Sequence, residues 1–428
     1  MTLPLLPKCS ATSADCIERR AAVRKARGDV HTARASLEYT AADNDLALAA
    51  KLRTPPIVVP PPMEAPVTPP PPFVEPKSGW VKASDIKPLP RYFDTNAFLR
   101  DAPIGSKVPI GELSAMRISQ PHVAISRVDP FFRVATGDHT HDLFNRSNIP
   151  ASGEYADLIA SNNAQGEGGL INASFYALGS LMVQDMDNVW HNLIARYSVF
   201  YYKHDMAENP IWNNKKLERV DFPRGMKLLG GIRHYRQPDD WRKVSSDPMS
   251  NSPVNYRILQ GNIGNPSNVE GATEYTWKLD ALLPFAKSGR HIQVNLEFPR
   301  FLMPDYVDSP NHTEHASYFP SETHCRVMPT LSTHAVYTLP DFPIKAIATS
   351  ADIDAKGNLK DEPGRETHGY WWEGFVDEIR ETIHRSVFDT GMDGSNGNLQ
   401  NGKAFTWAKP RPAKPLSVIV PSDQDYTI

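Results

Sequence analysis

The sequence predicts an α+β protein, in which an antiparallel β-rich body follows an N-terminal helix and a proline-rich spacer. Three observations predict this class: a dense run of prolines, one long run of apolar residues at helical spacing, and several short runs in which apolar and polar residues alternate. The predicted strands are not regularly interleaved with helices. This order argues against a doubly wound nucleotide-binding fold.

The proline run divides the chain into three parts. Of the 39 prolines, 11 lie between Pro55 and Pro76. Proline fixes φ and donates no backbone hydrogen bond, so we expect an extended polyproline-type spacer over 54–76. It separates an N-terminal arm, 1–53, from a globular body, 77–428. The alternative for the spacer is a docking motif for an aromatic-lined groove.

The arm is predicted to be helical over 13–53, because small apolar residues recur there at steps of three and four. Its apolar side is thin, since alanine buries little area. One interpretation is an arm that self-associates or faces nucleic acid through its basic residues; the other is a solvated helix that orders only on contact. In the nucleic-acid interpretation, the residues that face the nucleic acid are Arg19, Arg20, Arg24 and Lys25.

The body is predicted to contain two helices. Between about residues 170 and 205, apolar residues recur at helical spacing over most of the circumference, which predicts one long buried helix. A second helix is predicted over about 371–388, where Phe375, Ile379, Ile383 and Val387 share one face.

Strands are predicted from period-two alternation. In 291–298, Ile292, Val294, Leu296 and Phe298 alternate with polar residues, as in a sheet with one solvated face. The other predicted strands cover 115–119, 122–128, 326–331, 334–339 and 344–349. The segment 354–358 has the composition of a hairpin turn.

Charge and hydropathy exclude several classes. The formal net charge is -3, so no global field attracts nucleic acid or an anionic membrane surface. No stretch approaches the roughly 20 apolar residues of a membrane span, and the first residues lack the charged and apolar regions of a secretory signal. The three cysteines form neither a disulfide framework nor a zinc-ligand pattern, which favours a reducing compartment.

Histidines supply the metal-ligand candidates. The run 305–334 contains His312, His315 and His324, with carboxylates nearby, and imidazole and carboxylate are common ligands of zinc and iron. However, these histidines occupy a proline-flanked loop and match no zinc motif. The expectation is therefore hydrogen-bonded loop histidines, with no metal, no cofactor and no catalytic residue.

A second histidine pair lies at His139 and His141. A His-x-His pair on a strand places both imidazoles on one face, as in metal sites of small β-barrels. A glutamate is expected a few residues after such a motif, yet Asn145 and Ser147 occupy that region. The pair thus matches only part of the pattern.

The most basic part of the body spans 215–243. Aromatic residues are interleaved with its cations, the combination with which proteins bind single-stranded nucleic acid. The alternative is a solvated charged face. The candidate nucleic-acid-facing residues are Lys215, Lys216, Arg233, Arg236, Arg242 and Lys243.

These features together favour a structural, self-assembling protein, such as a viral capsid or virion subunit with an N-terminal arm. Its partners are then copies of itself in a large homo-oligomer, together with packaged nucleic acid, and its location is the virion or the host cytoplasm. The alternatives are a metal-dependent enzyme that uses the histidines of 305–334, and a non-catalytic scaffold or adaptor. Long proline- and asparagine-rich loops and the lack of a catalytic motif favour the first.

Overall fold

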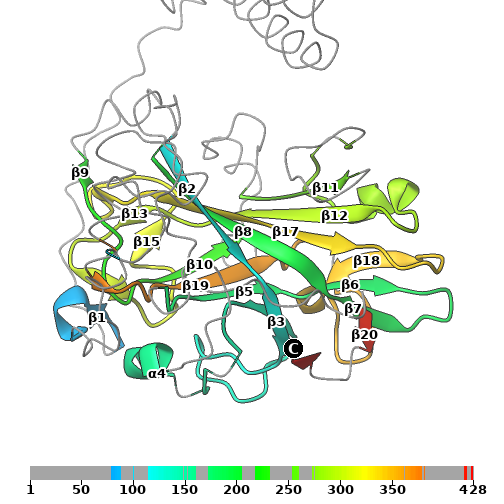
Figure 1. Cartoon of the computed structure of the whole chain (residues 1–428), viewed down its shortest axis with the longest axis horizontal. Helices are drawn as coiled ribbons and strands as arrows, with labels where there is room; N and C mark the ends of the chain where they lie inside the picture. Colours follow the sequence, from blue (N-terminus) through cyan, green and yellow to red (C-terminus); the bar gives the residue numbers. More distant parts are fainter. Residues whose placement is uncertain are drawn as a thin grey trace, which may run out of the picture. The chain divides into compact units, whose positions relative to one another are not determined.

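The structure is a computed structural model, and the chain divides into two compact units, 1–74 and 75–428. The structure describes residues 79–87, 114–160, 172–204, 217–231, 253–259 and 272–377, without 148, 152, 274 and 361, together with 100, 380, 419–421 and 426–427. The predicted helical arm and proline-rich spacer lie outside the described residues. The described part of the second unit is built mainly of antiparallel β-sheet (Figure 1).

One large sheet has six strands in the order β10-β19-β5-β4-β3-β21, and every neighbouring pair is antiparallel. Its strands are β10 (Lys227–Gly231), β19 (His368–Trp372), β5 (Phe175–Gly179), β4 (His141–Phe144), β3 (His122–Ser126) and β21 (Tyr426–Thr427).

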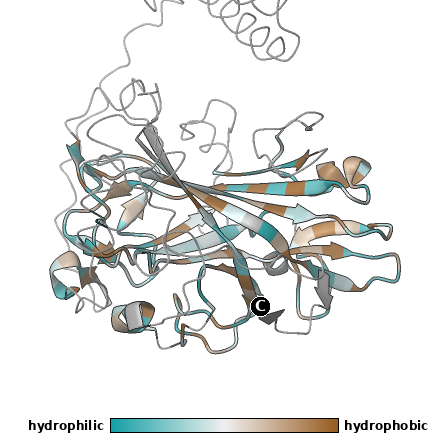
Figure 2. Ribbon diagram, viewed as in Figure 1, coloured by the Kyte–Doolittle hydropathy of each residue, from teal (hydrophilic) through white to brown (hydrophobic). Residues whose placement is uncertain are grey.

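The second large sheet has five antiparallel strands in the order β11-β12-β17-β8-β2. Its strands are β11 (Val254–Leu259), β12 (His291–Glu297), β17 (Thr330–Thr338), β8 (Ala195–His204) and β2 (Ser114–Gln120). Figure 2 shows apolar and polar residues alternating along β12, as the period-two pattern predicts.

The two large sheets pack face to face and enclose the main hydrophobic core, which takes buried side chains from both (Figure 1). Hydrogen bonds also cross between the sheets. The hydroxyl groups of Tyr176 and Tyr202 lie 2.6 Å apart, and Tyr337 donates to Asp142 at 2.6 Å. This arrangement is a β-sandwich, in which each sheet buries one face against the other.

Smaller elements surround the sandwich. The four-stranded sheets are β15-β13-β16-β9 and β18-β6-β7-β20, and β1 pairs with β14; only the β9–β16 pair among the described strands is parallel. Their bounds are β15 (Ala316–Ser317), β13 (Phe301–Leu302), β16 (Arg326–Val327), β9 (Glu218–Arg219), β18 (Ala346–Thr349), β6 (Leu181–Gln184), β7 (Trp190–Leu193), β20 (Ile419–Pro421), β1 (Val81–Lys82) and β14 (Tyr306–Asp308).

Helices are short in the described part of the chain. They are α4 (Tyr155–Ala160) and the 3-10 helices η1 (Ala83–Asp85), η3 (Asp280–Phe285) and η4 (Ser350–Asp352). Within those residues, no helix has the length and apolar character needed to cross a membrane.

The outer face of the six-stranded sheet carries a second hydrophobic cluster. It includes Leu143 of β4, Phe175 and Ala177 of β5, and Tyr370 and Trp372 of β19. Phe131 and residues of α4 cover these side chains from outside. The sheet is therefore buried on both faces over much of its area.

The predicted α+β class is wrong, because the long buried helix over 170–205 is not formed. The segment instead contains β5, β6, β7 and β8. Strands buried on both faces are apolar in nearly every position, so they lose the alternation that marks a strand. All five residues of β5 are buried, and this continuous apolar run also matches helical spacing.

The second predicted helix, over 371–388, is wrong at its start. Trp371 and Trp372 complete β19, and Phe375 forms a β-bridge with Asn172. Helical conformation is described only at Asp377 and Arg380, and the rest of the predicted helix lies outside the described residues.

Several predicted strands are confirmed, among them β12 within 291–298 and β3 within 122–128. The turn over 354–358 is also confirmed. The backbone N–H of Asp354 donates to the carbonyl oxygen of Asn358, the backbone N–H of Asn358 donates to Oδ1 of Asp354, and Ile353 bridges Leu359. The predicted break between 331 and 334 is not present, because β17 runs through it.

Candidate metal centre

Three histidines meet on the outer face of the six-stranded sheet. His139 precedes β4, His141 begins it, and His368 begins β19. His139 and His141 are two residues apart, so their side chains share the face that Leu143 also occupies. His368 shares the same face with Tyr370 and Trp372 for the same reason. The sheet thus brings together side chains that are 227 residues apart in sequence.

Gly179 makes room for this meeting. It ends β5, which runs between β4 and β19, and it lies opposite His141 in the register. Gly369 lies opposite Leu178, so His368 lies opposite Gly179 on the other side. A Cβ atom at Gly179 would lie 3.5 Å from Cε1 of His368. The imidazoles therefore reach across the central strand over a residue without a side chain.

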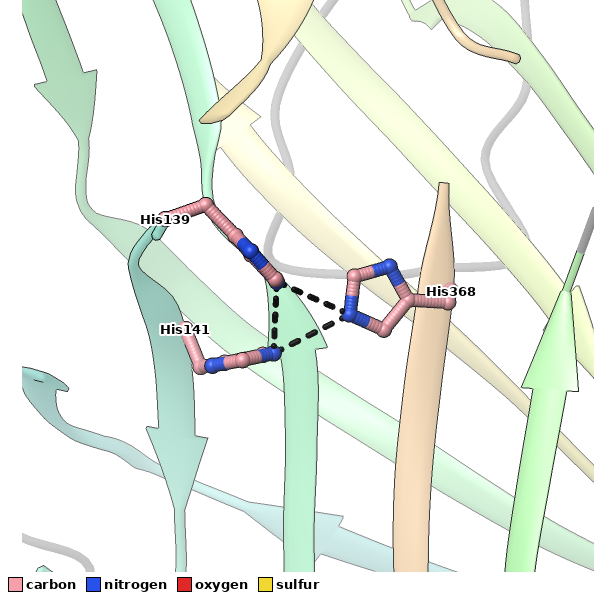
Figure 3. Close-up of side chains that lie close together, drawn as sticks. All are labelled: His139, His141 and His368. Carbon is pink, nitrogen blue, oxygen red and sulfur yellow. Dashed lines mark hydrogen bonds between the residues drawn. The ribbon is translucent and has the colours of Figure 1, made fainter. Parts of the chain in front are cut away.

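The three Nε2 atoms form a nearly equilateral triangle (Figure 3). The distances are 3.1 Å between His139 and His141, 3.1 Å between His139 and His368, and 3.0 Å between His141 and His368. All three residues are buried, with exposed fractions of 5%, 2% and 0%. Within the described part of the chain, this is the one group of His, Cys, Asp or Glu with the spacing of metal ligands.

Hydrogen bonds to the other ring nitrogen fix two of the imidazole tautomers. Nδ1 of His368 lies 2.8 Å from the carbonyl oxygen of Glu366, and Nδ1 of His139 lies 2.5 Å from Oδ1 of Asp138. A carbonyl and a carboxylate can only accept, so each Nδ1 carries the proton. In the neutral imidazoles, Nε2 of His139 and of His368 then has a lone pair and no proton.

These two lone pairs face each other at 3.1 Å, which cannot be a hydrogen bond. His141 can donate a proton to only one of them at a time. A cation bound by all three nitrogens resolves the repulsion. Histidines that bind metals characteristically donate their second N–H to a carboxylate or a backbone carbonyl, as His139 and His368 do.

The size of the triangle also fits a transition-metal ion. Donor atoms about 2.05 Å from one ion lie about 2.9 Å apart at right angles and about 3.3 Å apart at the tetrahedral angle. The observed separations of 3.0–3.1 Å fall between these values. The three nitrogens occupy one side of such an ion, which leaves further coordination positions for water or a substrate.

The loop that precedes β19 is held by a buried carboxylate. Asp352 accepts hydrogen bonds from the backbone N–H groups of Thr349, Gly364 and Glu366, at 2.7, 2.9 and 2.9 Å. Glu366 in turn provides the carbonyl that orients His368. Asp352 therefore fixes the segment on which the orientation of His368 depends.

Aromatic side chains pack beside the triangle. The ring of Tyr370 lies 4.8 Å from that of His141 and 5.3 Å from that of His368, measured between centroids. Tyr370 donates to Asp129 at 2.9 Å and stacks on Phe131. These contacts hold the imidazoles in place and surround the site with apolar groups on this side.

The histidines of 305–334 do not meet one another. Nε2 of His315 donates to the carbonyl oxygen of Lys227 at 2.6 Å, and its Nδ1 lies 2.9 Å from the hydroxyl of Ser309. His312 contacts Asp308 through Nδ1 at 2.5 Å, and His324 contacts the carbonyl oxygen of Glu314 through Nε2 at 3.0 Å. Each therefore has a separate hydrogen-bonding role.

Arg19, Arg20, Arg24, Lys25, Lys215, Lys216, Arg233, Arg236, Arg242 and Lys243 all lie outside the described residues. Nucleic-acid binding by these groups stays a prediction.

The residue that sequence reasoning missed is His368. The His-x-His pattern of His139 and His141 predicts a third ligand a few residues downstream, whereas the sheet provides it from β19. One local signal marks His368 in the sequence: Gly369 follows it directly, and three aromatic residues follow the glycine. This segment runs into the start of the helix predicted over 371–388.

The fold and this site define the class: an antiparallel β-sandwich with a buried three-histidine constellation. The chain belongs to the family described as a domain of unknown function, DUF1996, which matches residues 130–374. The matched region is more than half of the chain and contains His139, His141 and His368. No curated protein and no solved structure matches the chain.

Proposed function

We propose that the protein binds one divalent transition-metal ion, such as zinc, through Nε2 of His139, His141 and His368, and that this ion is the centre of a metal-dependent activity. The observation that carries the proposal is the convergence of three buried Nε2 atoms at 3.0–3.1 Å, two of them with lone pairs fixed by partners at Nδ1.

The ligand set indicates the kind of chemistry. Three neutral imidazoles leave the ion's positive charge uncompensated, and such an ion acts as a Lewis acid that makes a bound water more acidic. Asp138 contacts the His139 ring at Nδ1, on the side away from Nε2, so through this contact its carboxylate orients a ligand and is not itself one. The open coordination positions and the positive charge of the bound ion suit a substrate that offers an oxygen atom as a ligand.

The test is the metal content of the full chain purified without chelators. We expect about one transition-metal ion per chain, lost on dialysis against a chelator and restored by zinc or cobalt. Cobalt reports the coordination geometry by its visible absorption. Zinc at about a hundredfold excess over its dissociation constant is expected to stabilise the fold by about 2.7 kcal/mol. Protein that takes up neither zinc, cobalt nor copper would refute the proposal.

Self-assembly into a capsid or virion is a separate proposal, independent of the metal. Antiparallel sandwiches are an architecture that virion subunits use, and the described sheets share that general architecture. Location in the virion or the host cytoplasm depends on the same proposal.

Light scattering behind size exclusion tests assembly. We expect a particle of many subunits, with an absorbance ratio that reveals any bound nucleic acid. A homogeneous monomer or dimer at assembly conditions would count against it, and leaves the metal proposal unaffected.

A further inference from the structure

A second group of polar side chains lies on the same outer face of the sheet, beyond Tyr370 and Phe131. Lys227 begins β10 and lies opposite Trp372 of β19 in the register. Asp308 ends β14, and His312 lies in the turn that follows it. The exposed fractions of the side chains of Lys227, Asp308 and His312 are 8%, 9% and 11%. The group is therefore largely buried yet reaches solvent.

Asp308 links the two other members. Its Oδ1 lies 2.5 Å from Nδ1 of His312, and its Oδ2 lies 3.4 Å from Nζ of Lys227. Burial disfavours the charge of Asp308, but the hydrogen bond from His312 and the nearby charge of Lys227 outweigh it and hold the pKa of Asp308 below its usual value. The carboxylate is therefore ionised and accepts a hydrogen bond from Nδ1–H of His312.

His312 presents the other nitrogen as an acceptor. With the proton on Nδ1, Nε2 of the neutral ring has a lone pair. No residue in the described part of the chain forms a hydrogen bond with it. The backbone of His312 has φ 58, in the left-handed region that few residues other than glycine adopt, and strain of this kind is common at binding sites.

Lys227 supplies donors on the other oxygen of the same carboxylate. Its separation of 3.4 Å from Asp308 exceeds the about 2.7–2.9 Å of a strong charge-assisted hydrogen bond, so the carboxylate does not fully engage the ammonium group. The ammonium lies over the rings of Trp372 and Phe131, at 4.4 and 5.4 Å from their centroids. Neither ring competes for its N–H groups as a carboxylate would.

An exposed aromatic ring completes the group. Phe132 is 38% exposed, and its ring lies 4.9 Å from the ring of His312. Asp308 thus holds both the donor Lys227 and the acceptor His312, and the apolar ring of Phe132 lies against His312. Asp308 compensates the charge of Lys227, so the group is close to neutral and does not favour an anion.

From this juxtaposition we infer that Lys227, Asp308, His312 and Phe132 form a binding site for a sugar residue. A sugar hydroxyl donates to Nε2 of His312, and a neighbouring hydroxyl oxygen accepts from Nζ of Lys227. The C–H face of the sugar ring packs on Phe132. The inference does not depend on the metal proposal, because none of these residues is a proposed ligand.

Ligand-observed NMR of the full chain tests this inference, with the methyl glycosides of glucose, mannose and galactose as probes. We expect saturation transfer to at least one of them, with a dissociation constant in the millimolar range. Chelator is present throughout, so that failure of this site is distinguishable from failure of the metal centre.

Two variants locate the binding. Phe132→Ala and His312→Gln are each expected to weaken it by about tenfold. The matched control is Val134→Ala, since Val134 lies in the same loop and is also 38% exposed. Phe132 is partly exposed, so its variant is expected to fold even if His312→Gln does not.

Three outcomes would overturn the inference. They are no transfer to any of the glycosides, equal binding by Phe132→Ala and the wild type, and displacement of the glycoside by acetate or inorganic phosphate, which would identify an anion site.

Discussion

Replacing His368 by alanine is expected to lower the affinity for zinc or cobalt by more than the about 10–100-fold that loss of an outer-shell partner costs. The same holds for His139 and His141, because each supplies one of only three nitrogens in the triangle. Competition with a chromophoric chelator measures the affinity. Loss of the cobalt absorption band provides a second readout that is independent of stability.

The matched control is His324→Ala, a histidine that contacts the backbone of Glu314 outside the triangle. It belongs to the sequence-based candidates His312, His315 and His324, so it also compares the two predicted locations of a metal. Retained affinity in His324→Ala with loss in His368→Ala places the ion in the triangle. The reverse result would contradict the assignment.

Gly179 offers a steric version of the same test that leaves every ligand in place. A Cβ atom there meets Cε1 of His368 at 3.5 Å, an ordinary van der Waals contact, so Gly179→Ala is expected to retain the metal. The longer side chain of Gly179→Leu enters the space between the imidazoles and is expected to abolish binding. Equal affinity of the two variants would argue against the described geometry.

Acidification from pH 6.5 to 4 is expected to remove about 3 kcal/mol of stability through His315 alone. Burial lowers the pKa of this fully buried imidazole from 6.5 to about 4; Asp308 and the bond to Lys227 oppose the shift, while His312 and His324 add to it. Between these pH values the unfolded chain binds the proton and the folded chain does not. The contribution is therefore fully present above 6.5 and is lost as the pH falls.

The measurement is the free energy of unfolding in urea at a series of pH values, with chelator present. His315→Gln keeps a donor toward the carbonyl of Lys227 and removes the titration, so its curve is expected to be flatter between pH 6.5 and 4. The control is Thr338→Ser, which removes no ionisable group. We expect it to shift the free energy of unfolding by the same amount at every pH. Parallel curves for His315→Gln and the wild type would refute this prediction.

Pattern alone predicted those elements in which polar and apolar residues alternate, even where both faces are buried, as in β12. The strand β12 within 291–298 and the turn over 354–358 follow from alternation and turn residues, both of which are local. The same reasoning predicted a helix over 170–205, where the structure has β5 to β8. Most residues of these strands are apolar and buried, so the alternation that marks a strand disappears. Burial on a second face is a property of the tertiary structure, so no window of sequence records it.

The candidate site divides in the same way. The sequence by itself determines that His139 and His141 share a face, because residues two apart in an extended segment do so. Only the order of strands in the sheet decides that β19 brings His368 to them across Gly179. The register of paired strands is set by packing over the whole sandwich, and therefore residues 227 positions apart become neighbours that no local spacing predicts.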